Sequence, residues 1–457
     1  MTALIKILDD PQLAQQTILR RQSWDQVEVT PALQAGIERI FGEPLTPDQV
    51  VTRILSDVRQ SGDDALVDYT RRIEGIELDS IQVSEQEADK AWDAVPAALR
   101  DALQTAADRI RDFHERQYKQ SWIEWDDEGG ALGQIVRPIE RVGLYAPGGH
   151  TPYPSSLLMA AVPAKVAGVS EVVVTSPAGK DGRVAAVNLV AARIAGVSAV
   201  YKVGGAQAIA ALAYGTQSFP RVDKIGGPGN LFVVLAKRQV YGQVDIDGLP
   251  GPTETMLIAD DHADPGLVAA DLLAQAEHDV LASPILLTPS RALAERVQVE
   301  VARQVESLER AEIIVQSLAG QGGIVLTESL AQAISIANDY APEHLCLLLQ
   351  DPWRWVGTVR NAGGIFVGET ASEALGDYVV GPSHIMPTGG TARFSSPCNV
   401  WDYLKLTSIF APAASTIQRI GQAAVEIAQA EGLTAHAEAI RKRQERVSRL
   451  QTGSSPV

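Results

Sequence analysis

The sequence predicts an α/β protein with two tandem domains, each built on a parallel sheet, and with small helical parts at both ends. Three observations predict this class. From Val142 onward, short β-branched runs alternate with amphipathic helical stretches, which is typical of βαβ units. The alternation occurs as two successive sets, whereas the flanking segments have helical periodicity. The length of 457 residues also suits roughly two to four domains.

The first 135 or so residues are predicted to be mostly helical. Thr46 followed by Pro47 and Asp48 has the composition of a helix start, so we expect an amphipathic helix from there through Arg59. A second long amphipathic helix is expected over residues 96–117. His114 lies in it among charged residues and is expected to be solvated.

The two α/β sets follow in order. In the first set, strands are predicted at 171–175, 199–203 and 222–225, and helices at 155–167, 183–195, 206–214 and 231–241. In the second set, strands are predicted at 255–259, 283–288, 313–316, 323–327, 345–349 and 364–367, and helices at 265–278 and 290–310. A short C-terminal piece begins after about Ala413. No internal sequence repeat is visible, although the two sets could share an architecture.

Composition excludes several classes of protein. The formal charge of -17 argues against nucleic acid or an anionic membrane as partner. Lys165 and Arg193 interrupt the longest apolar stretches, so no membrane span is predicted. The N-terminus has the features of neither a signal peptide nor a transit peptide. Two cysteines, Cys346 and Cys398, cannot form a disulfide framework, which fits a cytoplasmic protein.

Three glycine-rich turns follow strands in the first set, although Gly-x-Gly-x-x-Gly does not occur after any predicted strand. The turns are 145–149 (Tyr-Ala-Pro-Gly-Gly), 203–207 (Val-Gly-Gly-Ala-Gln) and 226–230 (Gly-Gly-Pro-Gly-Asn). Such turns present backbone N–H groups and helix N-termini at the carboxyl edge of a sheet, where anionic ligands bind. Each turn alone is explained by tight backbone geometry, but three at one edge favour a nucleotide site.

Polar groups cluster around several of the 7 histidines. Gln275 and His278 are three residues apart and share one helix face. Imidazole, carboxylate and amide oxygen together suit zinc. The spacing by itself fits helix-end polar residues better, since glutamine is an uncommon zinc ligand. His436 would be given no role from its own surroundings.

Glu343 and His344 form a more specific pair. They lie between a helix end and an apolar strand, at the lip of the second predicted sheet. A carboxylate beside an imidazole there suits general acid and base catalysis, and the alternative is a histidine that caps a loop. Cys346 would share the side of His344 on a strand, which allows a thiolate–imidazole pair, although a buried cysteine more often fills space. Asp377 and His384 lie in a loop rich in glycine and proline.

These segments, in this order, resemble the histidinol dehydrogenase family. The likeness covers about residues 47–441 and rests on eight strings. They are 142–156 (VGLYAPGGHTPYPSS), 204–216 (GGAQAIAALAYGT), 226–232 (GGPGNLF), 251–260 (GPTETMLIAD), 268–278 (VAADLLAQAEH), 338–345 (NDYAPEHL), 376–394 (GDYVVGPSHIMPTGGTARF) and 431–436 (EGLTAH).

The resemblance implies two tandem incomplete Rossmann-like domains. We expect a helical segment at 1–45, and an α/β domain at 46–144 plus 252–390 that carries the zinc ligands and the Glu-His pair. The NAD-binding Rossmann-like domain is expected at 145–251. A C-terminal helical segment at 391–457 would contribute to the site of a partner subunit.

The resemblance also implies roles for individual residues. The zinc ligands would be Gln275, His278, Asp377 and His436. The NAD contacts would be Tyr145, Gln207 and Asn230, one in each glycine turn. The substrate would contact Thr253, Gln275, His278, His344, Asp377, His384, Glu431 and His436. In the family, the groups corresponding to Glu431 and His436 reach across from the partner in a homodimer. Thr253 stands where the family often has serine, and the hydroxyl is kept. Cys346 matches no catalytic position.

The implied reaction is the NAD- and zinc-dependent four-electron oxidation of L-histidinol through L-histidinal to L-histidine, which ends histidine biosynthesis. His344 would take protons in both oxidations, and Glu343 would activate water in the second. One alternative is a related zinc- and NAD-dependent dehydrogenase of another polar alcohol, such as a sulfonated propanediol. A remote alternative is a zinc-stabilised binding protein without catalysis.

Overall fold

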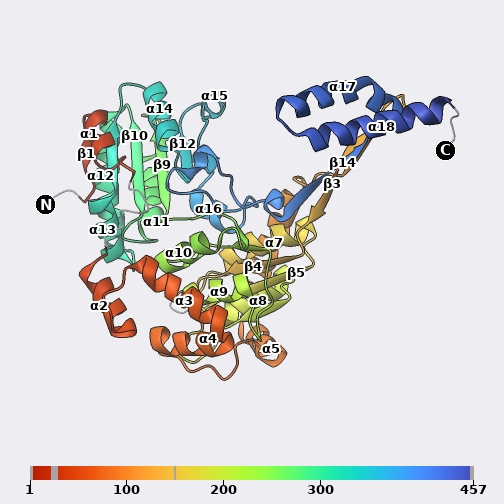
Figure 1. Ribbon diagram of the computed structural model, residues 1–457. Helices are drawn as coiled ribbons and strands as arrows, with labels where there is room; N and C mark the ends of the chain where they lie inside the picture. Colours follow the sequence, from red (N-terminus) through yellow and green to blue (C-terminus); the bar gives the residue numbers. More distant parts are fainter. Residues whose placement is uncertain (1–3, 22–28, 149–150, 453–457) are drawn as a thin grey trace. The chain divides into compact units, whose positions relative to one another are not determined.

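The computed structural model describes residues 4–21, 29–148 and 151–452 (Figure 1). The chain divides into two compact units, one comprising Met1–Gln117 and Ile139–Tyr403, the other Tyr118–Pro138 and Leu404–Val457. The predicted domain limits within these units stay predictions, and one strand, β4, spans the expected limit between residues 144 and 145.

The first unit contains a parallel sheet of five strands in the order β6-β5-β4-β7-β8. Its strands are β4 (Arg141–Tyr145), β5 (Glu171–Thr175), β6 (Ala199–Tyr201), β7 (Lys224–Gly226) and β8 (Asp245–Ile246). In chain order this is third, second, first, fourth, fifth, the arrangement of a Rossmann fold without its last strand. Ligands of such sheets bind where the strand order reverses, which here lies between β4 and β7.

Helices connect these strands and cover both faces of the sheet. The connecting helices are α7 (Pro154–Ala167), α8 (Ala186–Ala195), α9 (Gly205–Tyr214) and α10 (Leu231–Val240). The preceding helices also pack here, α3 against α9 and α10, α5 against α8, and α6 against α7. Their bounds are α2 (Pro31–Phe41), α3 (Pro47–Ser61), α4 (Asp63–Tyr69), the π-helix η2 (Thr70–Glu74), α5 (Glu85–Ala94) and α6 (Ala97–Glu115). The predicted start of α3 is confirmed, because Thr46 forms a capping box with Gln49.

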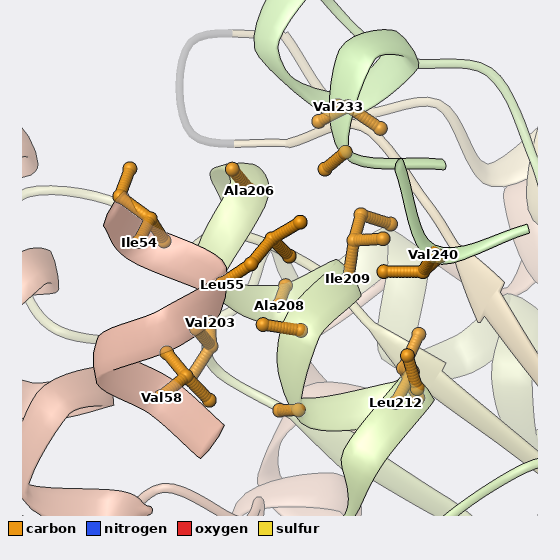
Figure 2. Packing of buried hydrophobic residues seen from close by; sticks show 14 of the residues in the cluster. Ile54, Leu55, Val58, Val203, Ala206, Ala208, Ile209, Leu212, Val233 and Val240 are labelled. Atoms are coloured by element: carbon orange, nitrogen blue, oxygen red, sulfur yellow. The ribbon is translucent and has the colours of Figure 1, made fainter. Parts of the chain in front are cut away.

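A continuous apolar core joins the N-terminal helices to this sheet (Figure 2). Ile54, Leu55 and Val58 lie on one face of α3, with the spacing expected of a buried helix stripe. They belong to the same buried cluster as Ile209 and Leu212 of α9. The core therefore packs the N-terminal helices onto the helices that open from the glycine turns.

Shortening one side chain in this core should cost a measurable part of the stability. Ile209 is completely buried, and we expect Ile209→Val to lower the free energy of unfolding by about 0.5–1.5 kcal/mol. Denaturant unfolding followed by circular dichroism would measure this. Val299→Ala is a suitable control, because Val299 is 66% exposed, and its effect should stay within about 0.5 kcal/mol. Equal shifts for both variants would contradict the packing argument.

The second sheet of the first unit has six parallel strands in the order β1-β11-β10-β9-β12-β13. Its strands are β1 (Ile7–Leu8), β9 (Glu254–Ala259), β10 (Ser283–Thr288), β11 (Gly323–Leu326), β12 (His344–Leu348) and β13 (Gly364–Val367). Apart from β1, the order repeats that of the first sheet. The two α/β sets thus share an architecture without a visible sequence repeat.

Buried residues on successive positions of these strands belong to two different clusters, one on each face of the sheet. Leu257 and Leu286 pack with α11, α12 and α13, whereas Met256 and Ile285 pack with α1 and α14. The helices of this part are α1 (Pro11–Gln16), α11 (Pro265–Ala276), α12 (Arg291–Val305), α13 (Ala311–Gly320), α14 (Leu330–Tyr340), α15 (Trp353–Val356) and α16 (Glu373–Tyr378), followed by the 3-10 helices η3 (Thr391–Arg393) and η4 (Val400–Tyr403).

Three predictions in the first unit are wrong, among them the loop predicted at Asp377, which lies on α16. Residues 313–316 were predicted as a strand but lie within α13. Their apolar run resembles a buried strand, yet the buried residues Ile314, Ser317 and Leu318 follow helical spacing. His114 was expected to be solvated but is completely buried, with Nδ1 2.7 Å from the carbonyl of Ile110. It faces the opposite side of α6 from its charged neighbours.

The second unit consists of an antiparallel sheet and two helices. The strands are β2 (Trp122–Trp125), β3 (Ala131–Pro138) and β14 (Leu404–Ala411), in the order β14-β3-β2. Helices α17 (Ala414–Ala430) and α18 (Thr434–Thr452) pack against each other through Val425, Ala428 and Ala437. None of these strands was predicted, because the strands are largely exposed and lack a clear apolar face.

The predicted fold class is confirmed, with parallel sheets and helical termini. The strands β1 and β14 lie within those terminal parts as additions. No helix in the described ranges is both long and apolar enough to cross a membrane.

Candidate active site

One large cavity in the first unit is lined by residues from both sheets. Its volume is about 1340 Å³, more than the roughly 300–1,000 Å³ of an ordinary small-molecule pocket. The lining includes all the site residues predicted in this unit, namely Tyr145, Gln207, Asn230, Thr253, Gln275, His278, Glu343, His344, Asp377 and His384. Residues far apart in the chain therefore meet in a space large enough for two ligands.

Tyr145 ends β4, on one side of the point where the strand order reverses. Its hydroxyl accepts a hydrogen bond from the backbone N–H of Gly205 at 3.2 Å. Burial, with a smaller effect of the carboxylate of Glu74, raises the pKa of Tyr145 to about 12. Gly227 follows β7 with φ 103°, and a Cβ there would lie 2.2 Å from the carbonyl oxygen of Tyr145. Only glycine permits this close approach of the two turns.

Gln207 and Asn230 occupy the starts of α9 and α10. Gln207 is completely buried, and neither polar atom of its carboxamide has a hydrogen-bond partner among the described residues. The side-chain oxygen of Asn230 accepts from the backbone N–H groups of Phe232 and Val233, at 3.0 and 3.2 Å. Asn230 thus caps α10, and the helix N-terminus at this edge is suited to an anionic ligand.

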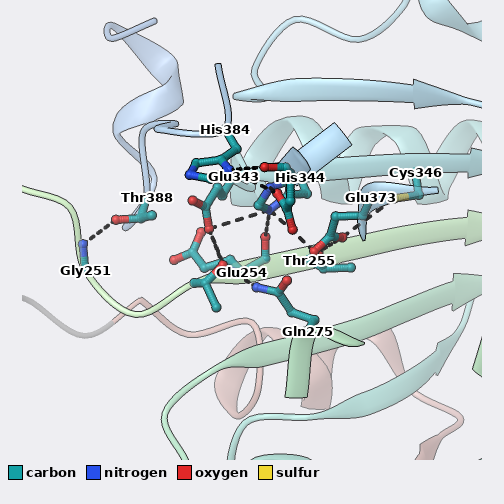
Figure 3. A network of polar contacts seen from close by, with 12 residues as sticks. Gly251, Glu254, Thr255, Gln275, Glu343, His344, Cys346, Glu373, His384 and Thr388 are labelled. Carbon is teal, nitrogen blue, oxygen red and sulfur yellow. Dashed lines mark hydrogen bonds and ion pairs between the residues drawn. The ribbon is translucent and has the colours of Figure 1, made fainter. Parts of the chain in front are cut away.

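The second group of side chains lies at the amino ends of strands in the second sheet (Figure 3). Thr253 directly precedes β9, and His344 is the first residue of β12. These are the amino ends of two neighbouring parallel strands, whereas the glycine turns are at carboxyl ends. Side chains from the amino edge of the second sheet and the carboxyl edge of the first therefore line one cavity.

His344 is held in one tautomer. Its Nδ1 lies 3.3 Å from the carbonyl oxygen of Glu254, and since a carbonyl only accepts, Nδ1 carries the hydrogen. Nε2 is then the basic nitrogen. It is buried and has no hydrogen-bond partner in the part of the chain that the structure describes. The nearest carboxylate oxygen, Oδ1 of Asp377, is 3.9 Å away. This nitrogen is available to take a proton from a ligand.

Glu343 is buried beside His344, with its Oε2 3.6 Å from Nδ1 of His344. The carboxylate accepts a hydrogen bond from the hydroxyl of Thr253 at 2.6 Å and from the backbone N–H of Glu254 at 3.0 Å. Burial raises the pKa of Glu343 to about 7, and the nearby His344 opposes part of this shift. A carboxyl with this pKa can act as acid or base near neutral pH.

Donor groups of the kinds that bind metals surround this pair. Gln275 is completely buried at the end of α11, and its carboxamide contacts the Thr253 hydroxyl and the carboxyl of Glu373. His278 follows the same helix and is an exposed residue of the cavity lining, and desolvation still lowers the pKa of its imidazole. Asp377 lies on α16, where its charge acts on His278. Neutral imidazole, carboxylate and amide oxygen are thus brought to one place.

His384 also faces this cavity. Its Nδ1 donates to the backbone carbonyl of Asp377 at 2.7 Å, so the last turn of α16 orients the ring. Its Nε2 then accepts from the hydroxyl of Ser156 at 3.0 Å. Burial lowers the pKa of His384, although Asp377 opposes the shift. The ring is held as a neutral imidazole with both nitrogens occupied.

Two predicted site residues lie in the second unit. Glu431 is the C-cap residue of α17 and His436 lies in the first turn of α18, and both are exposed. Cys346 is buried in β12 with Sγ 4.0 Å from the carboxyl of Glu373, and burial raises its thiol pKa well above the usual range. A buried thiol of this kind is a poor nucleophile.

One group of acidic and imidazole side chains lies outside this cavity. Within the described ranges, Asp260, Asp261 and His262 have ligand atoms that all lie within 4.8 Å of one another. They follow the carboxyl end of β9, the end away from Thr253, and two of them are exposed. Nothing else at this surface cluster indicates a ligand.

Sequence reasoning missed two carboxyl groups of the site. Glu254 supplies the carbonyl that orients His344, and its carboxylate contacts Arg21 and the N–H of Gly389. Glu373 is completely enclosed, and burial together with Asp377 raises its pKa well above the usual range. Glu373 stands four residues before Asp377 on α16, and this one-turn spacing was the available signal.

The fold and site define an oxidoreductase: glycine turns at the reversal point of a Rossmann-like sheet share a cavity with a base and a buried carboxyl. The sequence model described as histidinol dehydrogenase matches residues 44–444. The chain therefore belongs to the histidinol dehydrogenase family, and it is a dehydrogenase that acts on a small molecule.

Individual relatives agree with this assignment. A histidinol dehydrogenase from Deinococcus radiodurans is 54% identical over 424 residues, which cover 92% of this chain and 96% of the relative. One from Halalkalibacterium halodurans is 49% identical, covering 85% and 92%. The crystal structure of histidinol dehydrogenase from Elizabethkingia anophelis superposes with a TM-score of 0.90 at 32% identity, covering 98% of this chain and 100% of that one.

Proposed function

We propose that this enzyme oxidises L-histidinol through L-histidinal to L-histidine, with transfer of two hydrides to two successive NAD⁺, as the last steps of histidine biosynthesis. The observation that carries the proposal is the basic Nε2 of His344, unpartnered among the described residues, in a cavity shared with the three glycine turns. Family membership and 54% identity to a curated histidinol dehydrogenase support this substrate. The cytoplasmic location remains a prediction.

The residues present fit the two groups that this reaction needs. The carboxamide of Gln207, which has no hydrogen-bond partner among the described residues, suits NAD⁺ together with Tyr145 and Asn230 at the neighbouring turns, and NAD⁺ accepts the hydrides. Gln275, His278 and Asp377 supply the oxygen and nitrogen donors that suit zinc. Zinc would hold the imidazole and amino nitrogens of the substrate, and correct orientation alone is worth orders of magnitude in rate. Thr253 and His384 complete the proposed substrate contacts in this unit.

In the first oxidation, Nε2 of His344 takes the proton of the substrate hydroxyl as a hydride leaves the carbon. The carbonyl of Glu254 holds the hydrogen on Nδ1, so the ring presents its lone pair to the substrate. The charge of Asp377 nearby favours the imidazolium that forms. This step converts the alcohol into the aldehyde.

In the second oxidation, Glu343 takes a proton from water as the water oxygen adds to the aldehyde, and the His344 imidazolium returns its proton to the aldehyde oxygen, which gives the neutral hydrate. His344 then takes a hydroxyl proton of the hydrate as the second hydride leaves, which yields the carboxylic acid. Thr253 and the N–H of Glu254 orient the Glu343 carboxylate for this task. The two groups thus have distinct roles although they are adjacent in the chain.

We also propose that the enzyme is a homodimer in which Glu431 and His436 serve the site of the partner subunit, His436 as the fourth zinc ligand and both as substrate contacts. Their exposure on the second unit supports this role. Exposed apolar side chains near them, Ile427 and Leu433, would be covered in such an assembly.

The test is the amount of NADH formed per L-histidinol consumed, measured on enzyme as purified, after chelation, and after zinc is returned. We expect about two NADH per histidinol, loss of turnover on chelation, and recovery with zinc. One NADH per histidinol would contradict the second oxidation. No NADH with histidinol, but NADH with a sulfonated propanediol, would instead support the alternative polar-alcohol dehydrogenase. Full activity after complete metal removal would contradict the zinc site.

A further inference from the structure

Glu74 lines the same cavity from outside both sheets. It is the last residue of the π-helix η2, and π-helical turns are rare and frequent at functional sites. A Cβ added to Gly204 would lie 2.9 Å from Oε1 of Glu74. The carboxylate therefore rests against the glycine turn that opens α9, beside Tyr145 and Gln207.

One oxygen of the Glu74 carboxylate has no partner among the residues that the structure describes. This oxygen, Oε2, is also buried. Burial raises the pKa of Glu74 to about 7, without a counteracting cation or hydrogen bond. Both polar atoms of the neighbouring Gln207 carboxamide are also without partners there. Buried polar groups are nearly always satisfied in folded proteins, so three such atoms at one cavity wall indicate a polar ligand.

The surroundings of Glu74 restrict the chemistry of that ligand. The cavity lining also includes Ile37, Phe41, Ile54, Ile73 and Ile76, and the last two lie within two residues of Glu74 in the chain. An apolar wall of this kind suits a flat base such as adenine. A negative charge at the start of α9 disfavours a phosphate at this helix end. Hydroxyl groups, in contrast, can donate to a carboxylate in strong charge-assisted hydrogen bonds.

We propose that Glu74 accepts hydrogen bonds from the hydroxyls of the adenosine ribose of the dinucleotide and excludes a 2′-phosphate, so that the enzyme selects NAD over NADP. The inference rests on the proposed use of a nicotinamide dinucleotide. In Rossmann folds with the usual glycine fingerprint, an acidic residue about 20 positions after the glycines binds this ribose. Here a helical residue outside the sheet supplies the carboxylate.

The experiment measures equilibrium binding of NADH, NADPH and 2′-deoxy-NADH by calorimetry, without histidinol, to the wild-type, Glu74→Gln and Glu77→Gln enzymes. Glu77 is exposed and lies outside the cavity lining, so its variant carries the same charge change as a matched control. We expect wild-type enzyme to bind NADH far more tightly than NADPH. Glu74→Gln should weaken NADH binding about tenfold to hundredfold and should lower the NADH/NADPH preference at least tenfold.

Removal of the 2′-hydroxyl should weaken binding about tenfold in the wild-type and Glu77→Gln enzymes, but hardly at all in Glu74→Gln. The reason is that a direct contact between Glu74 and the 2′-hydroxyl, once removed by the substitution, cannot be lost a second time. If Glu74→Gln does not fold, Glu74→Asp keeps the charge and should retain discrimination against NADPH with weaker NADH binding. An unchanged NADH/NADPH preference in Glu74→Gln would overturn the role of Glu74 and leave the proposed function intact. A wild-type enzyme that binds neither nucleotide would overturn the cofactor proposal and this inference together.

Discussion

Replacing His344 with asparagine is expected to lower kcat for L-histidinol oxidation by about 10²- to 10⁴-fold. The amide can still donate to the Glu254 carbonyl, so the variant should fold and keep its zinc content. What it lacks is the basic Nε2, which is buried without a partner among the described residues and lines the cavity. Steady-state kinetics, with thermal unfolding and metal analysis on the same preparations, would measure the effect.

His262→Asn is the matched control for this substitution. His262 is 55% exposed at the other end of β9 and makes only loose contacts with neighbouring acidic groups. Its variant should keep the wild-type kcat. A His344→Asn enzyme with near wild-type turnover, or equal losses in both variants, would contradict the assignment of His344 as the base.

Replacing Glu343 with glutamine is expected to separate the two oxidations. The variant keeps His344 and should still convert histidinol to the aldehyde, while histidinal oxidation should slow by about 10²- to 10⁴-fold. NADH formed per histidinol should then fall from about two towards one. The physical reason is that a carboxamide cannot take a proton from water. Glu309→Gln, at an exposed position on the surface, should leave the stoichiometry unchanged.

The raised pKa of Glu343 also predicts how the rate of the second oxidation depends on pH. Burial raises the pKa of Glu343 to about 7, and its carboxyl must be ionised to act as a base. The rate of histidinal oxidation by wild-type enzyme should therefore fall as the pH decreases through about 7. This acidic limb should be absent in Glu343→Gln. A Glu343→Gln enzyme that oxidises histidinal at the wild-type rate would contradict the role of Glu343 in the second step. A wild-type pH–rate profile without the acidic limb would contradict it as well.

Much of the fold followed from local pattern. The capping residue Thr46, the alternation of β-branched and helical runs, and the three glycine turns were visible in the sequence, and they occur where expected. Local pattern failed where apolar runs are ambiguous, as in the helix at 313–316, and where strands are exposed, as in β14. Burial of His114 likewise depends on which face of α6 meets the rest of the unit.

In the candidate site, too, some residues could be recognised from local sequence and others could not. The adjacent Glu343 and His344 were recognisable because adjacency is a property of the chain, and the family strings placed the proposed metal and cofactor residues. Glu373 and Glu74 were missed because their surroundings come from distant segments: Thr255 and Gln275 around Glu373, and the turn before α9 around Glu74.

The sequence by itself determined the family, the α/β class and most residues proposed to do the chemistry, since these depend on residue type and spacing along the chain. The tertiary structure alone decided that the amino edge of one sheet and the carboxyl edge of the other share a cavity. It also decided which nitrogen of His344 is basic and why the pKa of Glu343 is near 7. Orientation and desolvation arise from contacts between segments about 90 residues apart or more, and no local pattern in the chain encodes them.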